Sequence, residues 1–552
     1  MLEAPTHSPR SFAAPYPVDM TPFTTELALA RRAQESWVKR SVRDRLRLVR
    51  NLRALLVERV ADISAAIHAD IARPAIEIIG SEILPCTAAL KFLEKRAARI
   101  LSPRRVSSWD RPVWLMGCRD AIHYRPWGVV GIIGTWNYPV HLNVGQIAFA
   151  LVAGNAVLWK PSENTPRTTK VIHQLFCDAG FPPDLLQTLP HTREAGPQLT
   201  ETDVDYMVFT GSDTVGRKLA ARLGERLIPS TLELSGCDAM FVLADADIEL
   251  AAKGVWFGLT LNRGQTCVAV RRVFVQRAKY AALVAALKPL ADRAVPMNLV
   301  MESQRTQADR LIQDAMKRGA SVLGEPNPLT PFPKKEGGTE PNTIDAKSSA
   351  MVLSPSPFRG GVGEGLFSTP FPSGRGDGGV GSALAPTLLL NTPADAAICR
   401  EACFAPVAAV IPFDTVEEAL AMANQSPFGL SASVFSADVA AAQEFAARVP
   451  SGSVVINDVL APTAHPATPF GGRGASGWGV TQGPEGLLAM TVPQVVTVHK
   501  GTFRPHLDDA ANPDPATIDL LHGLIRLTHA RGLRARLSGL WQMVRGIRKK
   551  RK

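Results

Sequence analysis

The chain has 552 residues, 46% of them hydrophobic and 20% charged, which is typical of a globular protein with two or three domains. Its formal net charge of +11 does not indicate a nucleic-acid partner, because residues 520–552 hold ten Lys and Arg and no Asp or Glu. Without these ten, 51 basic residues stand against 50 acidic ones, so the excess charge belongs to the C-terminal end.

Cysteine usage and hydropathy favour a cytoplasmic protein. The seven cysteines are scattered and form no CxxC pair, which favours reduced thiols over a disulfide framework or a structural zinc site, and no metal is expected. Residues 1–20 lack the basic start and continuous apolar core of a secretory signal. The longest apolar run, residues 147–159, is interrupted by Gly154 and Asn155 and is too short to span a bilayer.

The first half of the chain alternates between helical and strand patterns. Apolar residues recur three and four positions apart within residues 25–100, which predicts helices. Residues 113–124 are strand-like, and residues 129–134 predict a buried strand. Further helices are predicted at 146–154 and 168–179, and further strands at 156–160 and 206–210. This alternation is typical of a mainly parallel, wound sheet that binds ligands at the C-terminal ends of its strands.

The second half contains a change of composition and an unusual terminus. Residues 325–382 are rich in Pro, Gly and Ser and carry a degenerate repeat, so we interpret them as a disordered surface insertion. Strands are predicted again at 385–390, 454–457 and 493–499. Residues 533–547 predict a basic amphipathic helix with Trp541 on its apolar side. Such a helix suits an anionic membrane surface, and docking on protein is the alternative.

The most informative stretch runs from Glu233 to Cys267. A cysteine attacks a carbonyl carbon only as thiolate, so a catalytic cysteine needs an accessible pocket with a proton acceptor nearby, and Glu233 is a candidate for that acceptor. The alternative is that Cys267 is one of seven scattered cysteines and merely a small buried apolar residue.

Seven sequence blocks decide between these interpretations, because together they resemble the aldehyde dehydrogenase superfamily. The resemblance covers about residues 25–500, and no GxGxxG fingerprint accompanies it. In chain order the blocks are Thr135-Trp136-Asn137-Tyr138-Pro139, Lys160-Pro161-Ser162-Glu163, Phe209-Thr210-Gly211-Ser212, Leu232-Glu233-Leu234-Ser235-Gly236, Asn262-Arg263-Gly264-Gln265-Thr266-Cys267, Glu401-Ala402-Cys403-Phe404-Ala405-Pro406 and Pro469-Phe470-Gly471-Gly472 followed by Ser476-Gly477.

The resemblance implies an α/β fold with a Rossmann-variant nucleotide-binding domain, an α/β catalytic domain and a small β oligomerisation arm that makes a homodimer. The corresponding boundaries are an N-terminal segment 1–24, a nucleotide-binding domain 25–232 with arm strands at about 112–125, a catalytic domain 233–450 that includes the insertion, a return to the first domain at 451–500, and a C-terminal extension 501–552.

The resemblance also implies the chemistry, which is oxidation of an aldehyde to a carboxylic acid. Cys267 would attack the aldehyde, and the amide of Asn137 with the backbone N–H of Cys267 would hold the resulting oxyanion. Glu233 would activate the water that hydrolyses the thioester. Members that pass the acyl group to coenzyme A generally lack a glutamate at this position, so hydrolysis is favoured. The substrate is expected among medium- or long-chain aliphatic and aromatic aldehydes.

For the cofactor, the resemblance implies NAD, with NADP as the alternative. Lys160 and Glu163 would hold the adenosine ribose, and a carboxylate there repels a 2′-phosphate. The turn at Gly211-Ser212 would approach the pyrophosphate at a helix N-terminus. Trp136 would line the same site, and Phe404 would pack near the nicotinamide.

Three departures from the family pattern keep other functions open. The glutamate that binds the nicotinamide ribose is usually found where this chain has Ala402, and Glu401 stands one position earlier, so that role is not assigned to Glu401. Ala405 and Ser235 replace two glycines. The alternatives are an acyl-transferring, coenzyme A-dependent dehydrogenase and a catalytically retired, membrane-associated scaffold. Retention of Asn137, Glu233 and Cys267 speaks against the scaffold.

Overall fold

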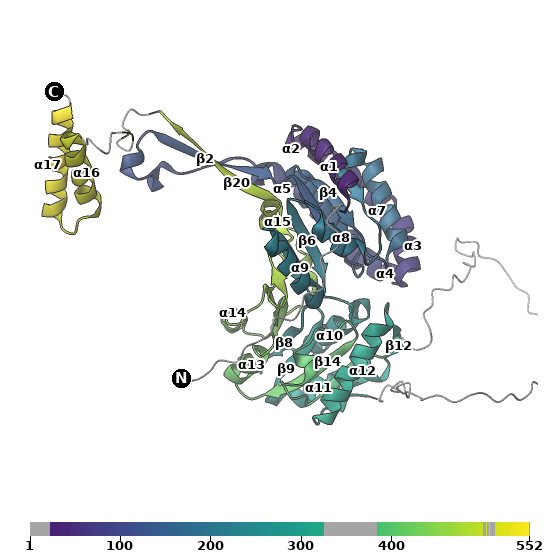
Figure 1. Cartoon of the computed structure of the whole chain (residues 1–552). Helices are drawn as coiled ribbons and strands as arrows, with labels where there is room; N and C mark the ends of the chain where they lie inside the picture. Colours follow the sequence, from purple (N-terminus) through teal and green to yellow (C-terminus); the bar gives the residue numbers. More distant parts are fainter. Residues whose placement is uncertain (1–21, 325–382, 501–503, 505–506, 508–513, 551–552) are drawn as a thin grey trace, which may run out of the picture.

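The computed structural model in Figure 1 describes residues 22–324, 383–500, 504, 507 and 514–550. The predicted N-terminal segment and the Pro/Gly-rich insertion fall almost entirely outside these ranges, so their interpretation stays a prediction. Within the described part, two separate parallel sheets each carry helices, and a thin β arm and a helical hairpin lie beyond them (Figure 1).

The predicted N-terminal helices are confirmed. Val49, Leu52 and Leu56 are fully buried on one face of α2, as their spacing predicts. Ser41 caps this helix because its hydroxyl accepts from the backbone N–H of Asp44. The elements are α1 (Thr24–Trp37), α2 (Val42–Glu58), α3 (Val60–Ile71), α4 (Ala75–Ile78), a π-helical turn (Ile79–Ile83) and α5 (Leu84–Ile100).

The first sheet has the strand order β19-β7-β6-β3-β4-β5. Its five longer strands are parallel, and every residue of β3 and β4 is buried, as expected when helices cover both faces. The strands are β3 (Val129–Ile133), β4 (Ala156–Lys160), β5 (Leu186–Thr188), β6 (Tyr206–Gly211), β7 (Ser230–Leu234) and the antiparallel edge strand β19 (Gly477–Trp478). The helices are α6 (His141–Ala153), α7 (Pro166–Asp178), α8 (Ala195–Glu201), α9 (Asp213–Glu225) and α15 (Gly483–Ala489).

The second sheet has the order β11-β13-β14-β9-β8-β16-β17 and is parallel except for β11. Its strands are β8 (Asp238–Val242), β9 (Val270–Gln276), β11 (Ser321–Val322), β13 (Thr387–Leu390), β14 (Val407–Phe413), β16 (Ser431–Phe435) and β17 (Ser453–Ile456). Its helices are α10 (Ile248–Thr260), α11 (Arg277–Asp292), α12 (Glu302–Lys317), α13 (Val416–Ala423) and α14 (Val439–Ala446). Two small pairs complete the region: β10 (Met297–Asn298) with β12 (Ala383–Leu384), and β15 (Phe428–Gly429) with β18 (Arg473–Gly474).

A long antiparallel ribbon forms the arm. Strand β2 (Cys118–Pro126) pairs with β20 (Thr491–His499), and β1 (Arg104–Arg105) adds a short edge. In Figure 1 this ribbon extends away from the sheets. Val495 and Val498 of β20 are 61% and 48% exposed. A strand edge with exposed apolar side chains can pair with the edge of another chain. The role of the arm in oligomerisation therefore stays a prediction.

The predicted C-terminal helix is confirmed as α17 (Leu533–Lys550), but it has a partner, α16 (Pro515–His529), that the sequence analysis did not predict. The two helices pack through glycines: a Cβ on Gly523 would meet the backbone of Met543 and Gly539, and a Cβ on Gly546 would meet the backbone of Ala516 and Leu520. Within the described part of α17, the buried residues are Gly539 and Gly546.

No helix within the described ranges is long and apolar enough to cross a bilayer. All seven cysteines are free thiols. Among the residues with described positions, no three His, Cys, Asp or Glu side chains gather closely enough to hold a metal ion.

Candidate active site

One cavity of about 910 Å³ opens at the C-terminal ends of β3, β4, β6 and β7. Parallel strands place their C-terminal ends at one edge, so residues that follow each strand are brought together there although they are far apart in the sequence. The structure places all nine predicted site residues in the wall of this cavity. They are Trp136, Asn137, Lys160, Glu163, Gly211, Ser212, Glu233, Cys267 and Phe404.

Cys267 follows a tight loop after α10. Asn262, Arg263 and Gly264 in this loop all have positive φ angles of 50°, 58° and 69°, a run that is uncommon for residues other than glycine. Gly264 is required because a Cβ there would lie 2.6 Å from the backbone of Ala405. The loop therefore packs directly on the segment that carries Phe404, and it leaves the thiol of Cys267 partly exposed to the cavity.

The surroundings of Cys267 favour the neutral thiol. Burial raises its pKa well above the usual value, and the nearby carboxylates of Glu233 and Asp238 raise it further. A neighbouring proton acceptor is therefore needed for the thiolate to form.

Glu233 faces this thiol from β7, next to the edge strand β19, whose Gly477 is its register partner. The side chain is 2% exposed, and neither carboxylate oxygen has a hydrogen-bond partner. Burial raises the pKa of Glu233 to about 7, although Cys267 and Thr210 lie close enough to lower it slightly. A buried carboxylate without a partner is costly, and a pKa near neutrality suits a group that accepts and releases protons.

Asn137 is held rigidly on the loop after β3. Its Oδ1 accepts from the hydroxyl of Thr135 at 2.6 Å, and its Nδ2 donates to the carbonyl of Gln265 at 3.1 Å. An amide nitrogen has two N–H donors, so one remains for a ligand in the cavity. The same contact with Gln265 joins the Asn137 loop to the Cys267 loop.

The far end of the cavity carries charged groups. Lys160 Nζ lies 3.4 Å from one Glu163 oxygen, and Arg193 Nε lies 2.9 Å from the other. Burial tends to raise the pKa of Glu163, but its own backbone N–H and these two cations lower it overall. Ser212 caps α9 by accepting from the N–H of Val215 at 3.4 Å, so the N-terminus of this 13-residue helix opens onto the cavity.

The loop of Phe404 contains Glu401 and Ala402, where the chain departs from the family pattern. The rings of Phe404 and Trp136 lie 6.3 Å apart and line the same wall. Glu401 forms an ion pair with Arg310 on α12 and does not line the cavity, whereas Ala402 does. The decision not to assign a cofactor role to Glu401 agrees with this geometry.

Sequence reasoning missed several residues that shape the site. Arg193 was not singled out because an exposed arginine in a loop has no distinguishing pattern. Asp238 is 4% exposed and its Oδ2 has no partner. It begins β8, and its position two residues after the Glu233 block was the available signal. Arg73 and Glu82 are both fully buried and contact the Asn137 loop.

The residues present fit a dinucleotide. A helix N-terminus with exposed N–H groups suits a pyrophosphate, a carboxylate beside Lys160 suits ribose hydroxyls, and two aromatic rings flank the end nearest Cys267. The cavity is continuous between these two ends.

Comparison with known proteins agrees with this geometry. The model of the family described as "Aldehyde dehydrogenase family" matches residues 20–354 and 371–496. The chain belongs to the aldehyde dehydrogenase family. Its reaction is the oxidation of an aldehyde with NAD or NADP as the hydride acceptor. The predicted family, fold class, enzyme class and cofactor are confirmed.

Relatives of this aldehyde dehydrogenase cover most of its length. The 4,4'-diapolycopene aldehyde oxidase of a Methylomonas species is 32% identical over 85% of this chain and 80% of its own. An aldehyde dehydrogenase of Mycobacterium tuberculosis in complex with NAD+ has a TM-score of 0.71 and 28% identity over 86% of this chain and 89% of its own. An NADP-dependent glyceraldehyde-3-phosphate dehydrogenase of Bacillus halodurans in complex with NADP has a TM-score of 0.72. It is 27% identical and covers 86% of this chain and 90% of its own.

Proposed function

We propose that this aldehyde dehydrogenase releases a free carboxylic acid, with Cys267 as the nucleophile, Glu233 as the general base and Asn137 as the oxyanion donor. The observation that carries the proposal is that a thiol and a buried carboxylate without a hydrogen-bond partner line one cavity. Because the Glu233 carboxylate is not engaged in hydrogen bonds that stabilise the fold, it is available to exchange a proton with a ligand or with the thiol.

In the first step Cys267 forms a C–S bond to the aldehyde carbon. The thiol proton passes to Glu233, whose pKa of about 7 lets it accept at neutral pH. The carbonyl π electrons move to the oxygen, which receives the free N–H of Asn137 and the backbone N–H of Cys267. Collapse of this thiohemiacetal expels a hydride and leaves a thioester on Cys267. A nicotinamide held beside Phe404 and Trp136 would supply the hydride acceptor.

In the second step water attacks the thioester carbon. Glu233, which has by then released the thiol proton to solvent, takes a proton from that water. The C–S bond breaks, the acid leaves, and the proton on Glu233 passes to the Cys267 thiolate, which restores the thiol. Lys160 and Glu163 would hold the adenosine end of the cofactor, and the N-terminus of α9 would hold its pyrophosphate. Phe404 and Trp136 would position the nicotinamide end.

The test of the base is pre-steady-state kinetics with Glu233→Gln. We expect a burst of reduced cofactor close to one per site that is slower than in the wild type, because the thiol has lost its proton acceptor. The steady state that follows should be slowed more, by at least about a hundredfold, because the hydrolytic water has no other base. Asp238→Asn is the matched control, since Asp238 is also a buried carboxylate but does not line the cavity. Equal loss of both phases in Glu233→Gln, or an equal effect of Asp238→Asn, would contradict the assignment.

We also propose that the substrate is a lipophilic aldehyde and that the C-terminal hairpin holds this cytoplasmic enzyme at an anionic membrane surface. The hairpin is packed in an unusual sense on the side of α17. Its buried residues there are Gly539 and Gly546, which meet Gly523 and Leu520 of α16, and the large apolar side chains of α17 lie outside. The buried residues of α16 also include Leu524. Small residues that let helix backbones approach closely are typical of helices in an apolar environment, where large side chains face lipid. The outward residues are 39% to 75% exposed and are Ile518, Ile525, Leu533, Leu537, Leu540, Trp541, Val544 and Ile547.

Charge agrees with this orientation. The hairpin carries a surplus of arginine and lysine, and each basic side chain near an anionic surface contributes about 1 kcal/mol of attraction. Its acidic residue Asp519 is already paired with Lys549 at 2.7 Å. A relative is named 4,4'-diapolycopene aldehyde oxidase. A lipophilic aldehyde partitions into lipid, so an enzyme at the membrane surface would meet it there.

The test is cosedimentation of the full chain with phosphatidylglycerol-containing and with purely phosphatidylcholine vesicles. We expect binding to the anionic vesicles alone, and loss of binding in the double variant Leu537→Ser/Trp541→Ser. Trp109→Ser is the matched control, because Trp109 is 96% exposed but lies outside the hairpin. Unchanged vesicle binding in the double variant refutes the lipid surface. Loss of a dimer in that variant, without any vesicle binding in the wild type, assigns the hairpin to protein docking.

We propose, in addition, that two copies pair through the arm, as the exposed valines of β20 support. Val495→Lys should shift the mass measured by sedimentation equilibrium from dimer to monomer, because a charge at this edge opposes strand pairing. A dimer of unchanged stability would remove the arm from the interface.

A further inference from the structure

A buried ion pair lies behind the catalytic loops, outside the cavity. Arg73 follows α3, Glu82 lies in the π-helical turn, and both side chains are fully buried. Arg73 Nη1 donates to Glu82 Oε1 at 2.7 Å. Neither residue lines the cavity, so neither can touch substrate or cofactor.

The pair clamps the loop of Asn137 at two points. Arg73 Nη2 donates to the carbonyl oxygen of Asn137 itself. The second oxygen of Glu82 accepts from the backbone N–H groups of Val140 and His141 at 3.0 and 2.7 Å. These bonds fix the middle and the end of the turn between β3 and α6.

The third arm of the guanidinium reaches the Cys267 loop. Arg73 Nε donates to Asn262 Oδ1 at 3.0 Å, and the Nδ2 of Asn262 donates to the carbonyls of Asn137 and Gln265 at 3.1 Å each. A contact in the other direction strengthens this junction, because Arg263 donates to the carbonyl of Ile71 at 2.8 Å. One arginine therefore joins the loop of the oxyanion donor to the loop of the nucleophile.

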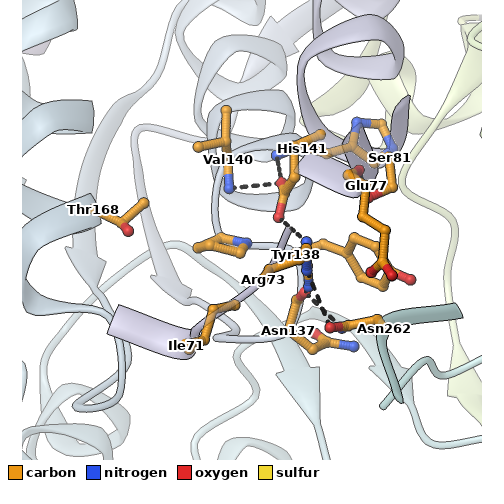
Figure 2. Close-up of polar contacts among 12 residues, drawn as sticks. Ile71, Arg73, Glu77, Ser81, Asn137, Tyr138, Val140, His141, Thr168 and Asn262 are labelled. Carbon is orange, nitrogen blue, oxygen red and sulfur yellow. Dashed lines mark hydrogen bonds and ion pairs between the residues drawn. The ribbon is translucent and has the colours of Figure 1, made fainter. Parts of the chain in front are cut away.

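Tyr138 adds a second connection between the same two loops. Its hydroxyl bonds to that of Thr266 at 2.6 Å, one residue before Cys267, and the guanidinium of Arg73 lies 4.8 Å from its ring centroid. Figure 2 shows Arg73 between Tyr138, Asn137 and Asn262.

Stability alone gives no reason for charges at this place. Moving an arginine and a glutamate out of water is costly, and apolar residues of similar volume often replace a buried pair without loss of stability. Burial raises the pKa of Glu82 to about 6 even though Arg73 opposes the rise, so desolvation is only partly offset. Glu82 also lies in a π-helical turn. Such turns are rare in proteins overall, and those that occur are frequently found at functional sites.

We propose that Arg73 and Glu82 are positioning residues that fix the amide of Asn137 relative to the thiol of Cys267. They act through Asn137 and Asn262 and touch no reacting atom. A displacement of about 1 Å at a reacting group can cost about a hundredfold in rate, and we expect a loss of that size in kcat/KM for the aldehyde when the pair is removed. The inference rests on the proposed roles of Asn137 and Cys267.

The decisive variant is Arg73→Met/Glu82→Gln, which removes both charges together and leaves no uncompensated buried ion. It should unfold at nearly the wild-type temperature and bind NAD with unchanged Kd, yet lose about a hundredfold in kcat/KM. The same pair of substitutions is then made in Asn137→Ala. If the pair acts through Asn137, it should cost little further activity in that background, because coupled residues give non-additive losses.

Three results separate the hypotheses. If the activity losses of Arg73→Met/Glu82→Gln and of Asn137→Ala simply add when the substitutions are combined, in this double-mutant cycle, the positioning role is wrong. Full activity of the Arg73→Met/Glu82→Gln variant would also overturn it. If Asn137→Ala alone keeps wild-type activity, the proposed oxyanion donor is wrong, and a loss in the Arg73→Met/Glu82→Gln variant then cannot be transmitted by Asn137. Should the double variant fail to fold, Asn262→Gly replaces it in the cycle, because glycine keeps the φ of 50° at this position and removes only the amide contacts.

Discussion

The free energy of unfolding should rise when Glu233 is replaced by glutamine, and the gain should depend on pH. Burial raises the pKa of Glu233 from 4.5 to about 7 in the folded chain. The folded state therefore binds a proton more tightly than the unfolded state does. Below pH 4.5 both states are protonated and the group has no effect. As pH rises from 4.5 to 7, the folded state loses stability, and above pH 7 the full penalty remains.

The magnitude follows from the pKa difference. At about 1.4 kcal/mol for each tenfold change in the dissociation constant, the ionised carboxylate destabilises the folded chain by about 3 kcal/mol at pH 8 and by less than about 1 kcal/mol at pH 5. Glutamine has the shape of the protonated acid and does not ionise. Glu233→Gln should therefore stabilise the apoenzyme by about 3 kcal/mol at pH 8 and by much less at pH 5.

The assay is urea denaturation of wild type and variant at both pH values, without cofactor. Glu163→Gln is the matched control, because the pKa of Glu163 is lowered and its removal should not stabilise the chain at pH 8. A gain in Glu233→Gln that is the same at pH 5 and pH 8, or a loss at pH 8, would refute the view that Glu233 is a buried carboxylate without compensation.

Three further outcomes are expected. Cys267→Ala should abolish aldehyde oxidation while calorimetry finds NAD binding intact; residual turnover at the wild-type rate would exclude the thiol. Gly477→Ala should lower both the melting temperature and kcat. This glycine has a φ of 95°, and a Cβ would collide with the carbonyl of Leu232, so β7 would have to move beside Glu233. An unaltered kcat would show that the site tolerates this movement of β7. Arg193→Ala should raise KM for NADP more than KM for NAD, by about two- to fivefold, since the cation that offsets Glu163 is lost; equal changes in both KM values would contradict this.

The sequence was most informative where local chemistry determines structure. Strand β4 was predicted with the bounds it has, because a short apolar run between a helix end and Pro161 has no other plausible conformation. Glu233, Cys267 and Asn137 could be named because the sequence blocks that contain them resemble those of the aldehyde dehydrogenase superfamily. The cavity that all three line confirms that the fold brings these blocks together.

Other features depend on contacts between distant segments, and the sequence does not display them. Arg73 and Glu82 look like ordinary surface charges in a helical region, and only the tertiary packing removes both from water. Strand β19 has two residues, too few for any periodic pattern. The hairpin escaped prediction for a related reason: an apolar stripe on α17 suggests an inward face, whereas its glycines, not its large side chains, form the contact with α16.

Strand β19 has a consequence for biosynthesis. The sheet that holds Glu233 is completed at one edge by residues 477 and 478, and the N–H of Leu234 in β7 donates to the carbonyl of the preceding Ser476. A ribosome therefore translates more than four-fifths of the message before Glu233 gains its final neighbouring strand. A nascent chain that stalls earlier holds Cys267 but lacks the strand that closes this edge of the sheet.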